Sequence, residues 1–150
     1  MKTEIILAAT FFVFFTGCSV KVPGYIGLRD GKLSEWPNSP NCVSSQTVKK
    51  DHAVDPLSYN GSYSEAKQAL LSIISSLPRT KIIADSDRYV HVTFTSRLMR
   101  FVDDVEFLFD ETNKQIHVRS ASRVGYSDMG VNRKRVEDLR KRFNERLNIK

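Results

Sequence analysis

Cys42 lies in the stretch SPNCVSSQ, residues 39–46, among turn-forming and hydroxyl side chains, and His52 follows ten residues later. A thiol acts as a nucleophile when its pKa is depressed and a base is nearby. His52 could supply that base, with Asp51 or Asp55 orienting its ring, which would give a thiol-dependent acyl transferase or hydrolase. The alternatives are a buried thiol and a cross-link to a second chain. We expect burial, because free cysteine is among the most buried residue types.

A second polar cluster lies in the stretch from residue 119 to residue 133. It spans the end of an expected strand, a turn with two glycines and the start of an expected helix, where backbone N–H groups and arginines together hold anions. We therefore predict a site for a small anionic or amphipathic ligand, with Arg119 and Arg123 facing a cavity. The candidate binding residues are Arg119, Ser120, Arg123, Tyr126, Asp128 and Arg133. In the structural alternative, Glu106 pairs with Arg119 across the sheet. Asp128 or Asn132 then only caps the helix.

Metal and nucleotide chemistry are not indicated by the sequence. His52, His91 and His117 are scattered without the paired spacing of metal ligands, so we expect no metal and no cofactor. The sequence contains no phosphate-binding glycine loop, no GxSxG motif and no HExxH pair. We therefore expect a non-enzymatic module that binds the small ligand or a protein partner. Thiol-dependent catalysis and a purely structural role in the envelope are the alternatives.

The first eighteen residues resemble an export and lipidation signal. Lys2 precedes the apolar run of residues 5–15, which has the length of a signal-peptide core and is too short to cross a bilayer as a helix. The following Thr-Gly-Cys resembles the lipobox of bacterial lipoproteins. On this resemblance residues 1–17 are removed and Cys18 carries acyl chains such as palmitate, each buried CH₂ contributing about 0.8 kcal/mol to anchoring. The alternative is ordinary secretion with cleavage near Gly17.

These features predict a membrane-anchored protein of the bacterial cell envelope. Ser19 follows the cysteine where proteins of the inner membrane often carry aspartate, which favours the outer membrane if the source has two membranes. The formal charge of +6 belongs to the C-terminal end, because residues 119–150 contain ten Lys or Arg and four Asp or Glu. Such a surface either binds anionic lipid headgroups or is simply solvated. Export makes nucleic acid an unexpected partner.

The periodicity of the chain predicts one α+β domain over residues 37–150, beginning with an irregular segment, after a lipid tether over residues 18–36. Ser62 and Glu65 form a capping box for a helix that ends before Pro78. Period-two alternation predicts strands near residues 82–84, 90–95, 104–109 and 116–118. A second helix begins near Asn132 and runs almost to the end of the chain.

The two longest expected strands define a hairpin register. Phe109 faces Ile116 on one side of the sheet, and Glu106 faces Arg119 on the other. The order helix, four strands, helix predicts a four-stranded antiparallel sheet packed against two helices as a two-layer sandwich, preceded by the irregular N-terminal segment.

Several stretches resemble the family called domain of unknown function 1499, found in bacteria and plant plastids. They are SPNCVSSQ followed by HAVDP at residues 52–56, FVDDVEF at residues 101–107 and VRSASRVGYSDMGVNRKRVE at residues 118–137. The resemblance extends from about Pro37 to Phe143 and implies the fold, but it implies no activity. Many relatives carry a cysteine before the proline that precedes SPNC, where this chain has Trp36. The resemblance therefore implies that Cys42 has no disulfide partner in this loop.

Overall fold

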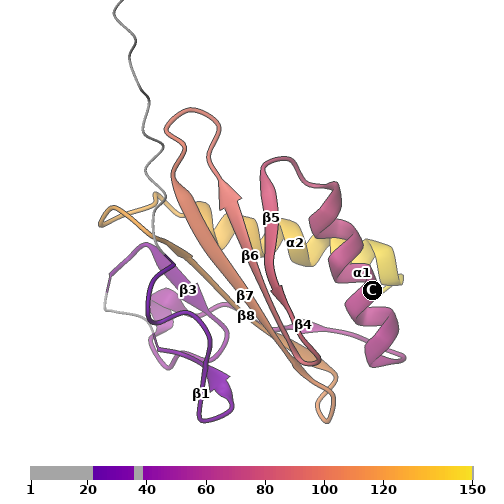
Figure 1. Cartoon of the computed structure of the whole chain (residues 1–150). Coiled ribbons are helices and arrows are strands. Elements are labelled where there is room, and N and C mark those ends of the chain that lie inside the picture. Colours follow the sequence, from indigo (N-terminus) through magenta and orange to yellow (C-terminus); the bar gives the residue numbers. More distant parts are fainter. Residues whose placement is uncertain (1–21, 36–38, 150) are drawn as a thin grey trace, which may run out of the picture.

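The computed structural model describes residues 22–35 and 39–149 (Figure 1). The predictions for Cys18 and Trp36 lie outside the described residues. The strands are β1 (Leu28–Arg29), β2 (Lys32–Leu33), β3 (Cys42–Ser44), β4 (Leu57–Ser58), β5 (Thr80–Asp85), β6 (Tyr89–Thr95), β7 (Val102–Asp110) and β8 (Gln115–Ser122). The helices are the 3-10 turn η1 (Lys50–His52), α1 (Tyr63–Ser76) and α2 (Val131–Leu147). Neither α-helix in this part of the chain is long and apolar enough to cross a membrane.

The main sheet has the strand order β3-β8-β7-β6-β5, and every pairing in it is antiparallel. β4 also pairs with β8, so this sheet contains six strands within the described residues, where the sequence predicted four. The two additional strands are short and show no alternation. They exist because Cys42 pairs with Ala121 and Leu57 pairs with Ile116 along the outer edge of β8. β1 and β2 form a separate two-stranded sheet.

The predicted hairpin register of β7 and β8 is confirmed. Phe109 pairs with Ile116, Phe107 with Val118 and Glu106 with Arg119. Successive side chains of a strand point to opposite faces, so this register places the aromatic rings on one face and the charged groups on the other. The register therefore assigns a chemical character to each face of the sheet.

The core lies between the sheet and the two helices, which Figure 1 shows on the same side of the strands. α1 begins at the predicted capping box, in which Ser62 and Glu65 bond reciprocally. The buried face of α1 contains Ala66, Ala69, Leu70, Ile73 and Ile74. Val136, Leu139 and Phe143 of α2 complete this layer. The predicted α+β class with two helices on an antiparallel sheet is confirmed.

Gly130 is the N-cap residue of α2. Its φ of 79° is left-handed, a conformation that glycine adopts at little cost. Asp128 satisfies the free N–H groups at this end. Its Oδ2 accepts from the Asn132 amide at 2.7 Å, and its Oδ1 accepts from the Gly130 amide at 3.0 Å. The carboxylate thus stabilises the beginning of the helix from two residues before the cap.

Candidate binding cavity on the charged face of the sheet

The face of the sheet that points away from the helices carries buried charged side chains. The alternation of β6, β7 and β8 places His91, Asp104, Glu106 and Arg119 on this face, and all four are buried. A buried charge costs several kcal/mol unless a partner and hydrogen bonds compensate it. The contacts of these groups therefore determine how the face is built.

Arg119 is the central cation of this face and is 1% exposed. Its guanidinium forms an ion pair with Glu106. It also donates to the carbonyl oxygens of Ser34 and, at 3.1 Å, Tyr25, and it lies 5.9 Å from the centre of the Tyr25 ring. The N-terminal segment thus supplies the acceptors that a buried guanidinium requires.

Glu106 accepts hydrogen bonds from the N-terminal segment and from β6. The Gly27 amide donates to its Oε1 at 2.7 Å, and the Tyr89 hydroxyl donates to the same oxygen at 2.6 Å. Burial and the hydrogen bond to Glu106 raise the pKa of Tyr89 far above its ordinary value. Residues 22–35, part of the tether expected from the sequence, are therefore packed on the domain and complete its charged face.

Arg123 and His91 share the carboxylate of Asp104. Arg123 donates through Nε and Nη2, each at 2.8 Å, and His91 Nε2 lies 2.7 Å from the carboxylate. Burial opposes ionisation of Asp104, but the hydrogen bonds from Arg123 and His91 outweigh it and hold the pKa of Asp104 below its ordinary value. This group forms a second charged network beside that of Arg119.

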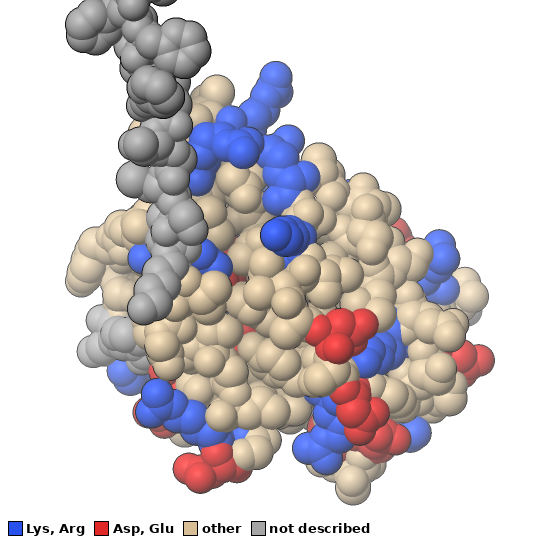
Figure 2. All heavy atoms as spheres, in the orientation of Figure 1, with Lys and Arg blue, Asp and Glu red and all other residues tan. Residues whose placement is uncertain are grey.

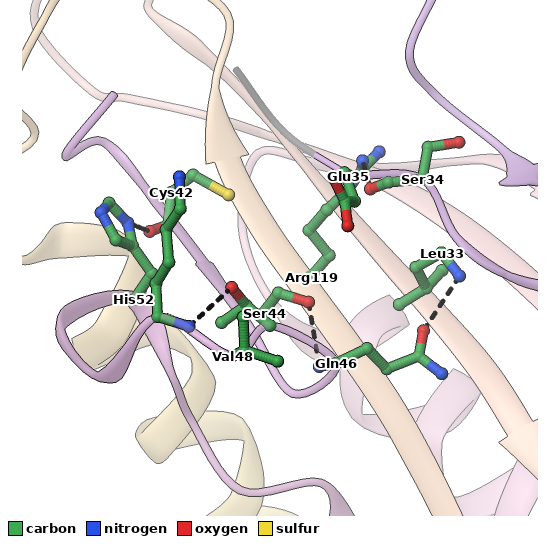
Figure 3. Close-up of a pocket in the computed structure, with 11 residues that line it drawn as sticks. Leu33, Ser34, Glu35, Cys42, Ser44, Gln46, Val48, His52 and Arg119 are labelled. Carbon is green, nitrogen blue, oxygen red and sulfur yellow. Dashed lines mark hydrogen bonds between the residues drawn. The ribbon is translucent and has the colours of Figure 1, made fainter. Parts of the chain in front are cut away.

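A cavity of about 130 Å³ opens beside Arg119. Its walls come from residues 33–35 of the N-terminal segment, Cys42 and Ser44 of β3, the loop of residues 46–49, and His52 of η1 (Figure 3). These segments all lie between residues 33 and 52, and they meet Arg119 because β3 pairs with β8. The cavity is thus a product of the short edge strand that the sequence pattern did not reveal.

Hydrogen-bond donors predominate in the cavity wall. Gln46 Oε1 accepts from the Leu33 amide at 2.9 Å, which leaves the NH₂ group of Gln46 as a donor. Ser44 Oγ accepts from the Gln46 amide at 3.2 Å, so its hydroxyl hydrogen is also available as a donor. Lys49 adds a cation and Glu35 adds a carboxylate. Ser44 and Gln46 both belong to the stretch SPNCVSSQ. Their hydroxyl and amide groups could have indicated a polar binding site, but the sequence interpretation considered only the thiol of this stretch.

Cys42 lines the same cavity but is buried, with an exposed fraction of 4%. Burial raises the pKa of its thiol to about 12. Figure 3 shows Sγ pointing to the Arg119 side and the imidazole of His52 lying on the other side of the cysteine backbone. The thiol is therefore protonated near neutral pH and has no base directed at it from His52.

His52 contacts the backbone of Cys42. Its Nδ1 lies 2.8 Å from the carbonyl oxygen of Cys42, and since a carbonyl oxygen only accepts, Nδ1 carries the proton. This contact holds η1 against β3. His52 thus lines the cavity and helps to hold η1 in place beside it.

The six residues expected to form an anion site do not converge. Arg119 lines the cavity, whereas Arg123 is absent from the described lining and binds Asp104. Ser120 lies on the helix side and donates to Asn132 at 2.6 Å. The remaining three are Tyr126, which is exposed, Asp128, which stabilises the start of α2, and Arg133, which donates to the carbonyls of Asp51 and Ala53.

Asn132 organises a separate polar cluster beneath α2. Its Nδ2 donates to the Asn41 carbonyl at 2.9 Å and to Ser122 Oγ at 3.0 Å. Arg135 forms an ion pair with Asp103 beside it. Over residues 22–35 and 39–149, no group of three or more His, Cys, Asp or Glu side chains could hold a metal ion.

Fold and site together define an α+β domain with helices on one face of its sheet and a charged network with a small donor-rich cavity on the other. The chain belongs to the DUF1499 family, whose description is "protein of unknown function" and whose sequence model matches residues 32–143. The match confirms the resemblance, and it includes β2 and the cavity wall at residues 33–35. No curated protein matches the chain.

Proposed function

We propose that this protein is a membrane-anchored lipoprotein of the bacterial cell envelope that binds a small anionic ligand in the cavity beside Arg119. The observation that carries the binding proposal is the donor-rich wall formed by Ser44, Gln46 and Lys49. Hydrogen bonds to an ionised acceptor are about twice as strong as those between neutral groups, so this wall favours an anion. The anchor is supported by the residue pattern that ends at Cys18.

The size of the cavity limits the ligand. A volume of about 130 Å³ corresponds to only a few water molecules, each occupying roughly 30 Å³ in the liquid. The enclosed part of the ligand is therefore a single small group, such as a carboxylate or a phosphate. Because Arg119 is already paired with Glu106, the neutral donors of Ser44 and Gln46 would bind the ligand directly, and Lys49 adds positive charge to the same wall.

Binding is favoured over thiol catalysis by the state of Cys42. A nucleophilic cysteine has a depressed pKa, whereas burial raises the pKa of this thiol to about 12. Its candidate base, His52, donates to a backbone carbonyl. The same two residues are better suited to forming the wall of a binding cavity.

The binding proposal is tested on the purified, detergent-solubilised protein. We expect native mass spectrometry to show a small co-purifying anion, and inorganic phosphate or acetate to shift the NMR amide signals of residues 44–49. Lys49→Ala should weaken the phosphate affinity obtained from these shifts by about tenfold or more, since a hydrogen bond to a charged group contributes about 1.5–3 kcal/mol.

Lys50→Ala is the matched control, because Lys50 is the adjacent lysine and is absent from the described cavity lining. It should leave the phosphate response unchanged. Equal responses in both variants would show that the signal is general surface charge. No shift with either anion and no co-purifying mass would overturn the proposal.

A further inference from the structure

One end of the sheet carries apolar side chains that point into solvent. It consists of the β6–β7 loop, residues 96–101, together with residues 124–131, which are the β8–α2 connection and the first residue of α2. We call it the docking end. We propose that the docking end rests on a bilayer containing anionic lipids. This inference builds on the proposed anchor at Cys18 and adds a defined orientation of the domain on the membrane.

The β6–β7 loop is closed by its own backbone. The Ser96 amide donates to the Phe101 carbonyl at 2.8 Å, and the Phe101 amide donates to Ser96 Oγ at 2.9 Å. Between these residues, Leu98 is 86% exposed and Met99 is 68% exposed. The hydrogen bonds hold the ends of the loop together, so the apolar tip projects away from the sheet.

The β8–α2 connection lies beside this loop. The Arg123 amide donates to the Val102 carbonyl at 3.1 Å, which joins the end of β8 to the start of β7. Seven of the twelve exposed large apolar side chains in the described residues belong to the docking end: Leu98, Met99, Phe101, Val124, Tyr126, Met129 and Val131. Single exposed apolar residues are normal, but a concentration of them at one end indicates an interaction surface.

Basic side chains surround the apolar tip. Arg97 and Arg100 lie within the loop, and Arg79 precedes β5 at the same end, where its carbonyl accepts from the Thr95 amide. All three are exposed, and on the face shown in Figure 2 Lys and Arg side chains gather at the end from which this loop projects. Basic residues close to a membrane are attracted by anionic headgroups, and apolar side chains between them enter the interface.

The opposite end of the sheet provides an internal comparison. The β7–β8 turn, residues 111–114, has the sequence Glu-Thr-Asn-Lys and exposes no large apolar side chain. Asp85, Asp87 and Asp110 lie close to it at the ends of the neighbouring strands. Lys67 pairs with Asp85, and Arg88 and Lys114 lie in the same turns, so this end carries mixed charges. The two ends of the sheet therefore differ mainly in their exposed apolar side chains.

The tether is long enough to let the docking end reach the membrane. The Tyr25 carbonyl accepts from Arg119, which faces Glu106 in the middle of β7. Seven peptide units join Cys18 to Tyr25 and span at most about 25 Å. From Glu106 to Val102, four residues along β7 cover about 13 Å. The docking end therefore lies within reach of an anchor at Cys18, and its apolar and basic side chains favour it over the opposite end.

The test places the acylated protein on vesicles of phosphatidylcholine with a minor fraction of phosphatidylglycerol and a nitroxide-labelled lipid. We expect paramagnetic broadening of the amide signals of residues 97–101 and 124–129 to exceed that of residues 111–113 several-fold. Leu98→Ser with Met99→Ser should abolish the difference. Arg97→Gln with Arg100→Gln should reduce it on anionic vesicles and have little effect on pure phosphatidylcholine.

Leu28→Ser is the control for loss of an exposed apolar residue, because Leu28 is 42% exposed and lies in β1, outside the described cavity lining. It should retain the broadening. Uniform broadening, or stronger broadening at residues 111–113, would overturn the docking end. Self-association in solution that Leu98→Ser with Met99→Ser abolishes, without broadening on vesicles, would assign this surface to a second copy of the chain and overturn the membrane proposal.

The intact mass of the same sample separates this inference from the proposed anchor. Acylated protein whose loops are not broadened overturns the docking end and leaves the anchor in place. Protein that lacks an acyl mass but contacts the vesicles through residues 97–101 overturns the anchor and leaves the docking end in place.

Discussion

At the scale of single residues, the charged face shows how a guanidinium is kept in the interior. Arg119 is paired with the Glu106 carboxylate and also donates to the carbonyl oxygens of Ser34 and Tyr25. Breaking a buried ion pair by removing one partner typically costs about 3–5 kcal/mol, because the other charge is left uncompensated. The contacts from the N-terminal segment are therefore part of the stability of the domain.

The raised pKa of Cys42 leads to a prediction about pH. Burial raises it from 9.0 to about 12, so the folded state holds the thiol proton more tightly than the unfolded state does. The contribution is fully present below pH 9 and is lost as pH rises towards 12, at up to roughly 1.4 kcal/mol per pH unit. We expect the free energy of unfolding to fall more steeply over this interval in the wild type than in Cys42→Ala.

Chemical denaturation at a series of pH values measures this difference in slope, and a thiol reagent supplies an independent readout. At pH 8 the folded protein should react slowly, with a rate that follows the unfolded fraction in urea. Rapid labelling of the folded protein at pH 8 would instead reveal an accessible, ionised thiol and would support the hypothesis that Cys42 is a nucleophile.

At the scale of elements, the start of α2 depends on one carboxylate. Asp128→Ala removes the acceptor for the amides of Gly130 and Asn132 and should cost about 1 kcal/mol, the usual value for a lost cap. Asp128→Asn should retain most of this stability. Urea unfolding measures both, and a cost of Asp128→Ala no larger than that of the exposed control Asp138→Ala would show that Asp128 has no capping role.

The elements also show how far sequence patterns reach. The four strands β5 to β8 were predicted because each has six to nine residues, long enough for alternation to appear. β3 and β4 have three and two residues, and their conformation is imposed by pairing with β8. The cavity was missed for the same reason, because its walls meet only after this pairing forms.

The basic face of α2 was only partly interpretable from the sequence. Arg133 donates to the carbonyls of Asp51 and Ala53, and Arg140, seven residues later on the same helix face, donates to the carbonyls of Asp55 and Pro56. These side chains hold the segment before β4 against the helix. A charge pattern gives no information on backbone partners, so a structural use of these arginines resembles a solvated surface in the sequence.

At the scale of the whole molecule, the proposed anchor makes a direct prediction. The wild type should be recovered in the membrane fraction without residues 1–17 and with acyl chains on Cys18, and Cys18→Ser should lose the acyl mass. Intact mass spectrometry and palmitate labelling measure both. Full-length wild-type protein that retains its first methionine and carries no acyl group would contradict the proposal.

The position of Gly27 and Tyr25 has a mechanical consequence. The Tyr25 carbonyl and the Gly27 amide form hydrogen bonds with the side chains of Arg119 and Glu106, and a few residues later the same segment forms one wall of the cavity. A force applied to the N-terminus is therefore passed by these bonds to β7 and β8 before it reaches β3 along the chain. Tension on the N-terminus therefore also acts on the segment that forms the cavity wall.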